Sequence, residues 1–535
     1  MADTARTTTA MPWNVAPIAI CLSGGGYRAA AFHLGTLAYL YRLNLLDNLA
    51  SISTVSGGTF TGAAYTLSLI EGESFPCFYR RFRDLLAETD LVKQALSLLG
   101  RTAHHGRGER NIIVAMADVY ARTFFEKTNG QPYLLRDILE TQVQLPDVSF
   151  NATEFRTGIA FRFQRRHGAV IGNGNVSIPS TEAGGIRLAD VVAASSCFPG
   201  GFEPLAFPDD FVWPGGAIPK AVAERLAKDD LPPRIALMDG GVYDNQGAST
   251  LHESVKNIAD ELSMFIISDV DTESKNIYSY PDNLGIRGWL GKLTLGHVRA
   301  AATALSVACF ASCLAIGTLF GMQLRTEGFV GLDFALYLVP FLLTLITLIL
   351  LQTIQSVIVK QVLPKIPQAG LAAWSDLKRV SVSQLAVMVG LRISSLYAMS
   401  SGIFMRRIRR LVYASIFRDK RYENKQLANL IYSLKDAKPP AADLPAPGDK
   451  LQQLATEATD MPTTLWFDDA RQMKVLIACG QATLCYKMIK LIIEQFGEDA
   501  NAYPADVRQV YACLAADWTK FCQAPEVIEP VEQES

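Results

Sequence analysis

Short apolar runs alternate with longer amphipathic stretches along the first half of the chain, from Ala16 to about Asp271. A helix is expected from Tyr27 to about Tyr41, directly after the first run and a group of glycines. Strands that alternate with helices of this length are typical of βα units and a mostly parallel sheet. The pattern therefore predicts an α/β fold, with buried strands at Ile18–Leu22, Ile52–Val55, Ile235–Met238 and Met264–Ser268.

Two much longer uncharged stretches follow, 25 residues between Arg299 and Arg325 and 26 residues between Asp333 and Lys360. At about 1.5 Å per residue, a helix over either stretch would reach a little under ~40 Å, enough to cross a ~30 Å hydrocarbon layer with some tilt. The pattern predicts a transmembrane helical hairpin over residues 299–360, with spans at about 300–324 and 334–359. A hairpin buried in a protein core is the alternative.

Charged residues around the hairpin predict its orientation. The flanks are basic, with Arg287, Lys292, Arg299, Lys360 and Lys365. The connecting loop has only Arg325, offset by Glu327 and Asp333. Because cytoplasmic flanks carry the excess of Lys and Arg, we expect a two-span membrane protein whose remaining chain faces the cytoplasm. Gly317 and Gly321 form a small-residue pair that would let helices approach closely, either within the hairpin or in a homo-oligomer.

The regions outside the hairpin divide by composition. Helical sequence resumes at about Ser381 and runs to Asp436, and another helical stretch covers Gln472–Phe496. The expected organisation is a flexible N-terminus (1–15), a first domain (16–285), helices that complete it (370–437), a Pro-rich linker (438–450), C-terminal helices (451–522) and a disordered acidic tail (523–535).

Composition narrows the classes of function. Hydrophobic residues make up 49% of the chain and charged residues 19%, with a net charge of −2. There is no basic field to attract nucleic acid, so no nucleic-acid partner is expected. The nine cysteines have no metal-ligand spacing and fit a reducing compartment, and no metal or cofactor is expected. Met1–Asn14 has no secretory pattern, so we expect the chain to begin in the cytoplasm.

A glycine-rich turn joins the first predicted strand to the first predicted helix. Its sequence is Gly24-Gly25-Gly26-Tyr27-Arg28. Glycines allow a tight turn and leave backbone N–H groups accessible, and at a helix N-terminus such donors stabilise an anion. That anion can be the oxyanion of an acyl-transfer intermediate, or a phosphate; a simple tight turn is a third interpretation.

A serine flanked by small residues follows the second predicted strand, in Thr54-Val55-Ser56-Gly57-Gly58. A sharp strand-to-helix turn that presents a nucleophilic serine needs small neighbours, usually as Gly-x-Ser-x-Gly. Thr54 takes the place of the first glycine, and we expect Gly57 and Gly58 to provide the room. An ordinary turn or helix cap is the alternative.

An aspartate ends the predicted strand at Ile235–Met238 and begins the sequence Asp239-Gly240-Gly241. In open parallel sheets the carboxyl edge of the strands is where ligands bind. An aspartate within hydrogen-bond reach of a serine can take its proton without a histidine. A turn aspartate that accepts nearby backbone N–H bonds is the alternative.

Taken together, the three motifs resemble those of the patatin-like phospholipases, a family that includes the catalytic domains of the cytosolic phospholipase A enzymes. The stretch Val191–Pro199, continuing to Phe202 and Pro204, resembles the family's Ala-Ser…Pro…Phe segment. The resemblance covers about residues 16–271. It implies a three-layer fold with a mostly parallel central sheet, to which this chain would add the hairpin and C-terminal helices.

The resemblance also implies a role for each motif. Ser56 would be the nucleophile and Asp239 its base, in a serine–aspartate dyad. The oxyanion hole would be formed by Gly24, Gly25 and Gly26. Supporting positions would be Arg28, which orders that loop, together with Gly57, Gly58, Gly240 and Gly241. The expected activity is release of fatty acids from a membrane phospholipid or another acyl lipid at the bilayer.

Other functions remain open at this stage. The same dyad would serve a thioesterase or an acyltransferase, and an effector that needs a trigger would share the chemistry. An inactive membrane scaffold or sensor is a further alternative, with Thr54 as its support. His252 and His297 follow Asp239, as a triad histidine would, but a structural or surface role is expected for both.

One basic segment, Phe404–Arg421, is open to two interpretations. Its apolar residues recur at helical spacing, with arginines on other faces. Such a helix can lie on an anionic membrane surface and help to present lipid. It can equally pack against the core with a basic outer face.

Overall fold

The computed structural model describes residues 12–99, 111–166, 168–227, 234–272, 278, 288–326, 331–357 and 379–532. Several positions named above lie outside these residues: 1–11, Arg287, Glu327, Lys360, Lys365, 370–378 and 533–535. The chain forms two compact units, one from residues 1–275 and 403–535 and the other from 276–402. The first unit is thus formed by the segments that precede and follow the second unit in the sequence.

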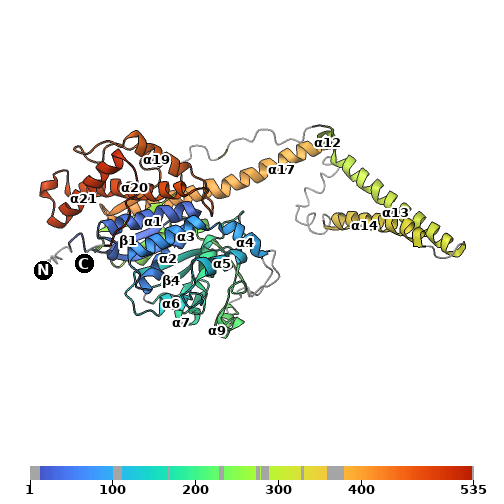
Figure 1. Ribbon diagram of the computed structural model, residues 1–535, viewed down its shortest axis with the longest axis horizontal. Helices are drawn as coiled ribbons and strands as arrows, with labels where there is room; N and C mark the ends of the chain where they lie inside the picture. The colour runs from blue at the N-terminus through green and yellow to red at the C-terminus, as the bar shows by residue number, and fades with distance from the viewer. Residues whose placement is uncertain are drawn as a thin grey trace, which may run out of the picture. The chain divides into compact units, whose positions relative to one another are not determined.

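A ten-stranded sheet forms the centre of the first unit (Figure 1). Its strands are β1 Ile18–Leu22, β2 Leu49–Val55, β3 Asp147–Glu154, β4 Ile159–Arg165, β5 Ile171–Gly172, β6 Ser177–Ile178, β7 Leu205–Phe207, β8 Ile235–Asp239, β9 Met264–Asp269 and β10 Gln426–Leu430. The order is β10-β9-β1-β2-β3-β4-β5-β6, with β8 and β7 branching from β3. All pairs from β10 to β3 are parallel. The remaining pairs, β3–β4, β3–β8, β4–β5, β5–β6 and β7–β8, are antiparallel. The fold is α/β, as predicted, and the strands from β10 to β3 form the parallel part of the sheet.

Strand β8, which ends at Asp239, departs from the expectation. Strand β3 continues past the end of β2, because Val55 at that end pairs with Asn151 and β3 runs on to Glu154. β8 pairs with this extension in the antiparallel direction, with Asp239 opposite Ala152. Asp239 therefore does not lie at the carboxyl edge of a parallel strand. It reaches the end of β2 from the opposite direction.

Helices cover both faces of the sheet. Those of the first unit are α1 Gly26–Arg42, α2 Gly57–Ile70, α3 Phe75–Glu88, α4 Leu91–Leu99, α5 Ile112–Thr123, α6 Leu135–Leu139, α7 Ser180–Ala183, α8 Leu188–Ser196, α9 Lys220–Leu226, α10 Gly241–Asp244, α11 Ala248–Ser254, α18 Met405–Phe417, α19 Asp449–Asp460, α20 Ala470–Phe496 and α21 Ala505–Gln523. Alternate residues of β1 enter different cores: Ile18 and Ile20 pack with α1 and α20, whereas Ala19 and Cys21 pack with α11 and α18. This alternation is what a strand buried on both faces requires.

Helices α1 and α20 pack backbone to backbone, and Figure 1 shows them side by side. A Cβ on Gly35 would clash with the carbonyl of Ile477, and a Cβ on Gly480 with the carbonyl of Phe32. Helix α20 is apolar enough to cross a membrane, yet 83% of its most apolar window is buried inside the fold. Its hydropathy therefore reflects its place in the core.

The C-terminal region packs against the rest of the first unit more extensively than its composition predicted. Residues 426–430, expected to be helical, form edge strand β10 beside β9. The expected linker at 438–450 packs on the core, where Trp518 Nε1 donates to the carbonyl of Pro445 at 2.9 Å. The acidic tail is held at Ile528, which exchanges two hydrogen bonds with Gln481, and at Glu532, which accepts from Ser74 Oγ at 2.8 Å. Prolines and charges alone do not reveal these contacts.

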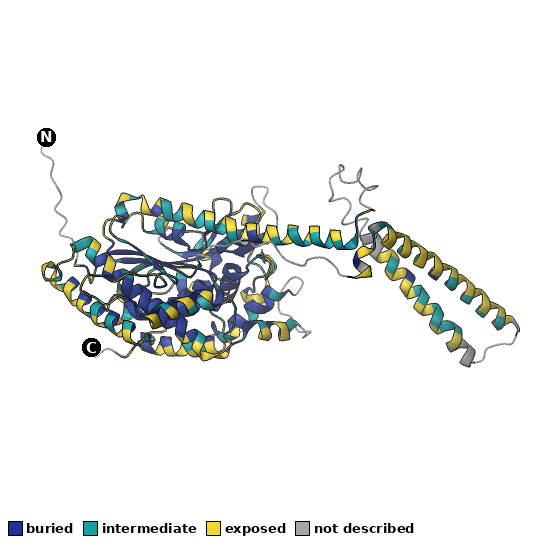
Figure 2. Ribbon diagram, turned by 90° about the horizontal axis from the view of Figure 1, so that it is seen from above, coloured by how far each residue is buried: buried dark blue, intermediate teal, exposed yellow. Residues whose placement is uncertain are grey.

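The second unit is helical and mostly exposed. It contains α12 Trp289–Lys292, α13 Leu295–Thr326, α14 Gly331–Val357 and α17 Val382–Tyr397. α13 and α14 form a hairpin in which Cys313 Sγ contacts Thr344 Oγ1 at 3.2 Å and Gly317 faces Phe341. Gly317 thus serves packing within the hairpin. By length and composition, Gly296–Gln323, Leu336–Thr353 and Val382–Phe417 are candidate membrane spans, and each is at most 6% buried. Figure 2 shows the outer surfaces of α13 and α14 as exposed.

Candidate active site

Ser56 lies at the turn between β2 and α2 in a backbone conformation that is unusual for a residue with a side chain. Its φ is 51° and its ψ is −119°. Residues other than glycine adopt such positive φ values only at a cost on the order of 1–3 kcal/mol. α2 begins immediately after the serine, at Gly57. The turn has the strained strand-to-helix geometry expected of a nucleophilic serine.

The two glycines after the serine allow the turn to lie directly against the glycine-rich loop. A Cβ on Gly57 would clash with the carbonyl of Gly26, and a Cβ on Gly58 with the carbonyl of Leu22. The Gly58 N–H donates to the carbonyl of Ser23 at 3.1 Å. These close approaches bring two motifs, 30 residues apart in the sequence, into contact.

A chain of hydroxyl groups holds the strained turn in place. Ser195 Oγ donates to the carbonyl of Asn151 at 2.7 Å and accepts the Ser56 N–H at 3.0 Å. Its oxygen also lies 2.8 Å from Thr59 Oγ1, which in turn lies 2.9 Å from Thr54 Oγ1. Because the Ser195 hydrogen is already used, Thr59 donates to Ser195 and Thr54 donates to Thr59. The chain fixes the backbone of residue 56 through its own N–H.

Thr54, which replaces the usual first glycine, is accommodated from another direction than expected. A Cβ on Gly62 would clash with Cγ2 of Thr54. The room for the threonine methyl therefore comes from Gly62 in α2 and not from Gly57 and Gly58. The threonine hydroxyl meanwhile takes part in the chain that supports Ser56.

The three glycines of the predicted oxyanion hole are not equivalent. The Gly24 N–H donates to the backbone carbonyl of Asn245 at 2.9 Å, so it is not available to a ligand. Gly25 and Gly26 have φ values of 145° and 58°, which favour glycine. Within the described residues, neither of their N–H groups donates a hydrogen bond to another part of the protein. Gly25 and Gly26 are therefore the candidate donors of the loop.

The C-terminal part of the chain supports the glycine-rich loop from outside. The Tyr27 N–H donates to the carbonyl of Thr464 at 2.9 Å, and a Cβ on Gly26 would clash with the same carbonyl. Arg28 donates from Nη1 to the carbonyl of Met461 at 2.8 Å. Arg28 thus orders the loop by binding the segment after α19.

His33 holds the residue that begins the glycine-rich loop, Ser23, by a hydrogen bond. Its Nε2 lies 3.0 Å from the carbonyl of Ser23, and its Nδ1 lies 2.9 Å from Ser268 Oγ. A carbonyl can only accept, so Nε2 carries the hydrogen and Nδ1 accepts from the serine. Burial lowers the pKa of His33 to about 4, so the ring is neutral at physiological pH. It acts as a fixed donor to the strand end that begins the loop.

Asp239 is held beside Ser56 in a buried environment. Burial raises the pKa of its carboxyl to about 6, against the opposing effects of the Gly241 N–H and the Ser56 side chain. The Gly241 N–H donates to Oδ1 at 2.7 Å. Gly240 is needed because a Cβ there would clash with the carbonyl of Asn151. Because burial disfavours the ionised form, this carboxylate accepts a proton more readily than an exposed aspartate does.

Asn245 joins the three motifs. A Cβ built on Gly241 would lie 2.6 Å from Asn245 Oδ1 and 3.0 Å from Asp239 Oδ1. A Cβ on Gly24 would clash with the same Asn245 oxygen and lie 3.1 Å from Ser56 Cβ. The structure thus brings Ser56, Asp239 and the glycine-rich loop together around one asparagine side chain.

The sequence analysis missed the residues that position this cluster. Ser195 lies within the Val191–Pro199 segment, and Asn245 lies four residues after Gly241, so both are close to predicted motifs. Asn151, Thr59 and His33 carry no local signal, because their contacts are made across strands and helices.

The two histidines that follow Asp239 make their recorded side-chain contacts elsewhere, His252 in a partly buried position and His297 at the surface. His252 Nε2 lies 3.0 Å from Asp419 Oδ2, and His297 Nδ1 lies 2.9 Å from Thr294 Oγ1. Neither contact involves Ser56 or Asp239. Among the described residues, no group of three or more His, Cys, Asp or Glu side chains could hold a metal ion.

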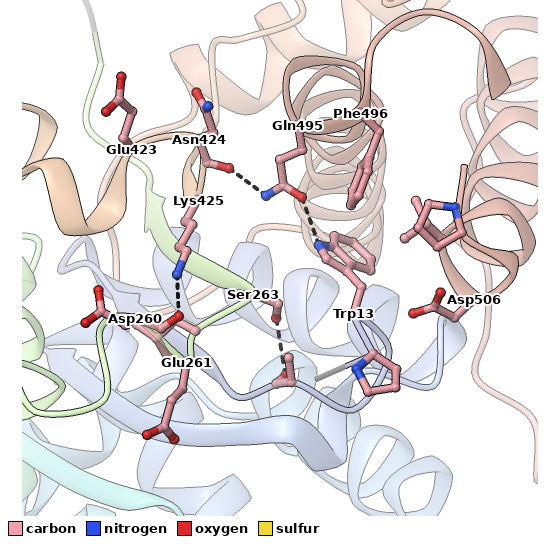
Figure 3. A pocket seen from close by; sticks show the side chains of 15 residues that line it. Trp13, Asp260, Glu261, Ser263, Glu423, Asn424, Lys425, Gln495, Phe496 and Asp506 are labelled. Atoms are coloured by element: carbon pink, nitrogen blue, oxygen red, sulfur yellow. Dashed lines mark hydrogen bonds between the residues drawn. The ribbon is translucent and has the colours of Figure 1, made fainter. Parts of the chain in front are cut away.

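A pocket of about 710 Å³ lies at the other end of the strands (Figure 3). Its lining includes Ser263 and Lys425, which precede β9 and β10 at their amino ends. Trp13 and Gln495 close one side through a hydrogen bond of 3.1 Å. Because Ser56 follows β2 at its carboxyl end, this pocket is separate from the serine cluster.

Residues 20–252 match the sequence profile of the family described as patatin-like phospholipase. The match includes all three motifs and the hydroxyl chain. These residues therefore form a patatin-like phospholipase domain, the domain of a family of lipid ester hydrolases. The chain's own structure completes this domain with β9, β10 and the C-terminal helices.

Solved structures similar to the chain include human GIVD cytosolic phospholipase A2, with 17% identity over 48% of this chain and 46% of that chain and a TM-score of 0.29. The same human enzyme in complex with methyl gamma-linolenyl fluorophosphonate and terbium chloride matches at 23% identity, over 28% and 23%, with a TM-score of 0.21. VipD from Legionella pneumophila is 10% identical over 95% and 92%, with a TM-score of 0.22. The chain spans less than half the length of the human structures, and no curated protein sequence matches it.

The fit of Thr54 against Gly62 can be tested by paired substitutions. Gly62→Ala should destabilise the protein by about 1–3 kcal/mol, because its methyl group would overlap Thr54 Cγ2. Thr54→Ser in the same chain removes that methyl, keeps the hydroxyl and should restore most of the loss. The measurement is denaturant unfolding of both single variants and the double variant. Equal losses for Gly62→Ala with and without Thr54→Ser would contradict the fit.

Proposed function

We propose that the protein is a membrane-anchored serine lipid acyl hydrolase of the phospholipase A or lysophospholipase type, with Ser56 as nucleophile and Asp239 as base. The observation that carries the proposal is the placement of a strained serine beside a buried carboxyl whose pKa is raised to about 6. A base with a pKa near neutrality can take a serine proton and return it within one catalytic cycle.

The chemistry needs only groups of this chain and water. Ser56 Oγ attacks the ester carbonyl while its proton passes to Asp239, and the Gly25 and Gly26 N–H groups stabilise the oxyanion. Collapse of the tetrahedral intermediate expels the alcohol, which takes the proton from Asp239. Water then attacks the acyl-enzyme with Asp239 again as base, and fatty acid and free Ser56 result.

Lipid as substrate is supported by the family of residues 20–252 and by the long apolar helices of the same chain. A thioesterase or acyltransferase would use the same groups, and substrate comparison separates them. The inactive scaffold loses its main support, because Gly62 and the hydroxyl chain accommodate Thr54.

The hydrolase is tested by fatty-acid release from mixed phospholipid vesicles. Wild type should release fatty acid, and Ser56→Ala and Asp239→Asn should each reduce the rate at least ~10³-fold, because nucleophile and base act as one unit. Ser254→Ala is a suitable control, since that hydroxyl only donates to the carbonyl of Thr250. Wild-type rates in both site variants would show that the site assignment is wrong. Transfer of the acyl group to an added alcohol or lysolipid in place of water would favour the acyltransferase.

We further propose that α13 and α14 cross the bilayer as a two-span hairpin. Their candidate spans, Gly296–Gln323 and Leu336–Thr353, have mean hydropathies of 1.9 and 2.1 and are almost unburied in the protein. Exposed apolar surface of this extent is unfavourable in water and favourable in lipid.

The first unit contains segments from both sides of the second unit in the sequence, and this restricts the number of membrane crossings between them. Residues 1–275 and 403–535 build one unit, so the chain must return to the side from which it left. The number of crossings between them is therefore even. Three candidate spans lie in or begin in this interval. If α13 and α14 cross, α17 does not.

This topology is tested with epitope tags at the N-terminus, at the C-terminus and between α13 and α14, followed by protease digestion of sealed vesicles. The terminal tags should share one side of the membrane, which the positive flanks predict to be cytoplasmic, and the inserted tag should be on the other. Digestion of all three tags from the same side would rule out the crossing hairpin.

A further inference from the structure

Helix α18 packs against the rest of the first unit along one face. Arg409 donates from Nε to Asp269 Oδ2 at 2.9 Å, and the Tyr413 hydroxyl donates to the same oxygen at 3.1 Å. Ile416, one turn further on, is fully buried. These three positions follow helical spacing and define the inner face of α18.

The inner face lies against the support of the candidate active site. Asp269 is the last residue of β9, and the next residue, Val270, donates its N–H to Ser23 Oγ at 3.1 Å. A Cβ on Gly25 would lie 2.6 Å from a methyl group of Val270. Because Arg409 is near the start of α18, the beginning of this helix lies at the catalytic edge of the sheet.

The opposite face of α18 exposes large apolar side chains. Phe404, directly before the helix, is 53% exposed and Leu411 is 54% exposed, whereas the exposed Phe417 lies to the side, next to Tyr413, with ring centroids 5.8 Å apart. Phe404 and Leu411 are two helical turns apart and lie on the side away from Arg409. Single exposed apolar residues are ordinary, but several on one helix face indicate a surface that contacts something apolar.

The charges on this outer face are all positive. Arg407, Arg410 and Arg418 are exposed. In the part of the chain that the structure describes, none of the three has an ion pair or hydrogen bond through its side chain. The sequence from 403 to 418 contains no aspartate or glutamate. The outer face thus alternates aromatic or aliphatic groups with arginines that have no acidic partner on their own helix.

We infer that the outer face of α18 is a docking surface for an anionic lipid bilayer, which it meets at the membrane–water interface. Apolar side chains would enter the headgroup region while the arginines bind lipid phosphates, the usual arrangement of an interfacial helix. Acidic protein partners would satisfy the arginines but not the exposed apolar side chains of Phe404 and Leu411. A second copy of this face would bring like charges together.

This surface complements the hairpin. α18 begins a few residues after α17, within one long apolar helical stretch, Val382–Phe417. In this proposal it does not cross the membrane itself, because its inner face carries the Arg409–Asp269 pair and packs on the rest of the first unit. A hairpin restrains the chain to the bilayer, whereas α18 sets which edge of the sheet faces it.

The docking surface is tested with the full chain reconstituted in vesicles and a photo-crosslinking amino acid at Leu411. The background is Ser56→Ala, so the result does not depend on hydrolysis and remains interpretable if the proposed enzyme function is wrong. Vesicles are phosphatidylcholine alone or phosphatidylcholine mixed with phosphatidylglycerol. Crosslinked lipid should form at Leu411, with a yield about tenfold higher in the anionic vesicles. The matched control site is Val15, which is equally exposed (53%) but at the amino edge of the sheet, and which should give no lipid adduct.

The charge requirement is tested in the same assay. Arg407→Glu with Arg410→Glu should reduce the lipid adduct about tenfold, and the corresponding Gln pair should reduce it less. Lys256→Glu with Lys490→Glu makes the same charge change on other exposed positions and should have no effect. Absence of lipid adducts at Leu411, equal adducts at Val15, a protein–protein adduct to a second chain, or insensitivity to both charge changes would each overturn the inference.

Discussion

The conformation of one residue, Ser56, is the constraint on which the rest of the site depends. A side chain at φ 51° is unfavourable, and it persists only where surrounding contacts outweigh the strain. Here two features stabilise the turn. Gly57 and Gly58 have no side chains and so allow close backbone packing, and the chain of hydroxyl groups ends in a hydrogen bond to the Ser56 N–H. The same close packing brings the serine turn against the glycine-rich loop. The strain and the proximity of the motifs therefore have one physical origin.

The second half of the chain is part of this arrangement. The family match ends at residue 252, yet the glycine-rich loop rests on Thr464 and Met461, and helix α1 packs through Gly35 against α20. The second unit is thus inserted within a domain whose two parts pack closely against each other. If the proposed hairpin crosses the bilayer, this insertion ties its position to an intact first unit, and α18 lies where the chain re-enters that unit.

The sequence predicted what depends on local pattern. The strands Ile18–Leu22 and Met264–Ser268, the helix after the glycines and the three motifs are visible as apolar runs and turn residues. What it could not predict depends on long-range pairing. The direction of β8 follows from an extension of β3, β10 resembles its helical neighbours in composition, and Gly62 compensates Thr54 across a helix–strand contact. The unequal roles of Gly24 and Gly25 depend likewise on Asn245, which lies over 200 residues away.

The central claim is that a buried Asp239 activates Ser56, and the most direct measurement is the rate at which a fluorophosphonate labels Ser56 as a function of pH. The labelled residue is identified by mass spectrometry. Since only the ionised carboxyl accepts the serine proton, the rate should rise with pH, with a midpoint near the raised pKa of about 6, and fall about tenfold per pH unit below it. Asp239→Asn should label slowly at every pH. Labelling of Ser56 that is equally fast in Asp239→Asn, or independent of pH from about 5 to 8, would contradict the account.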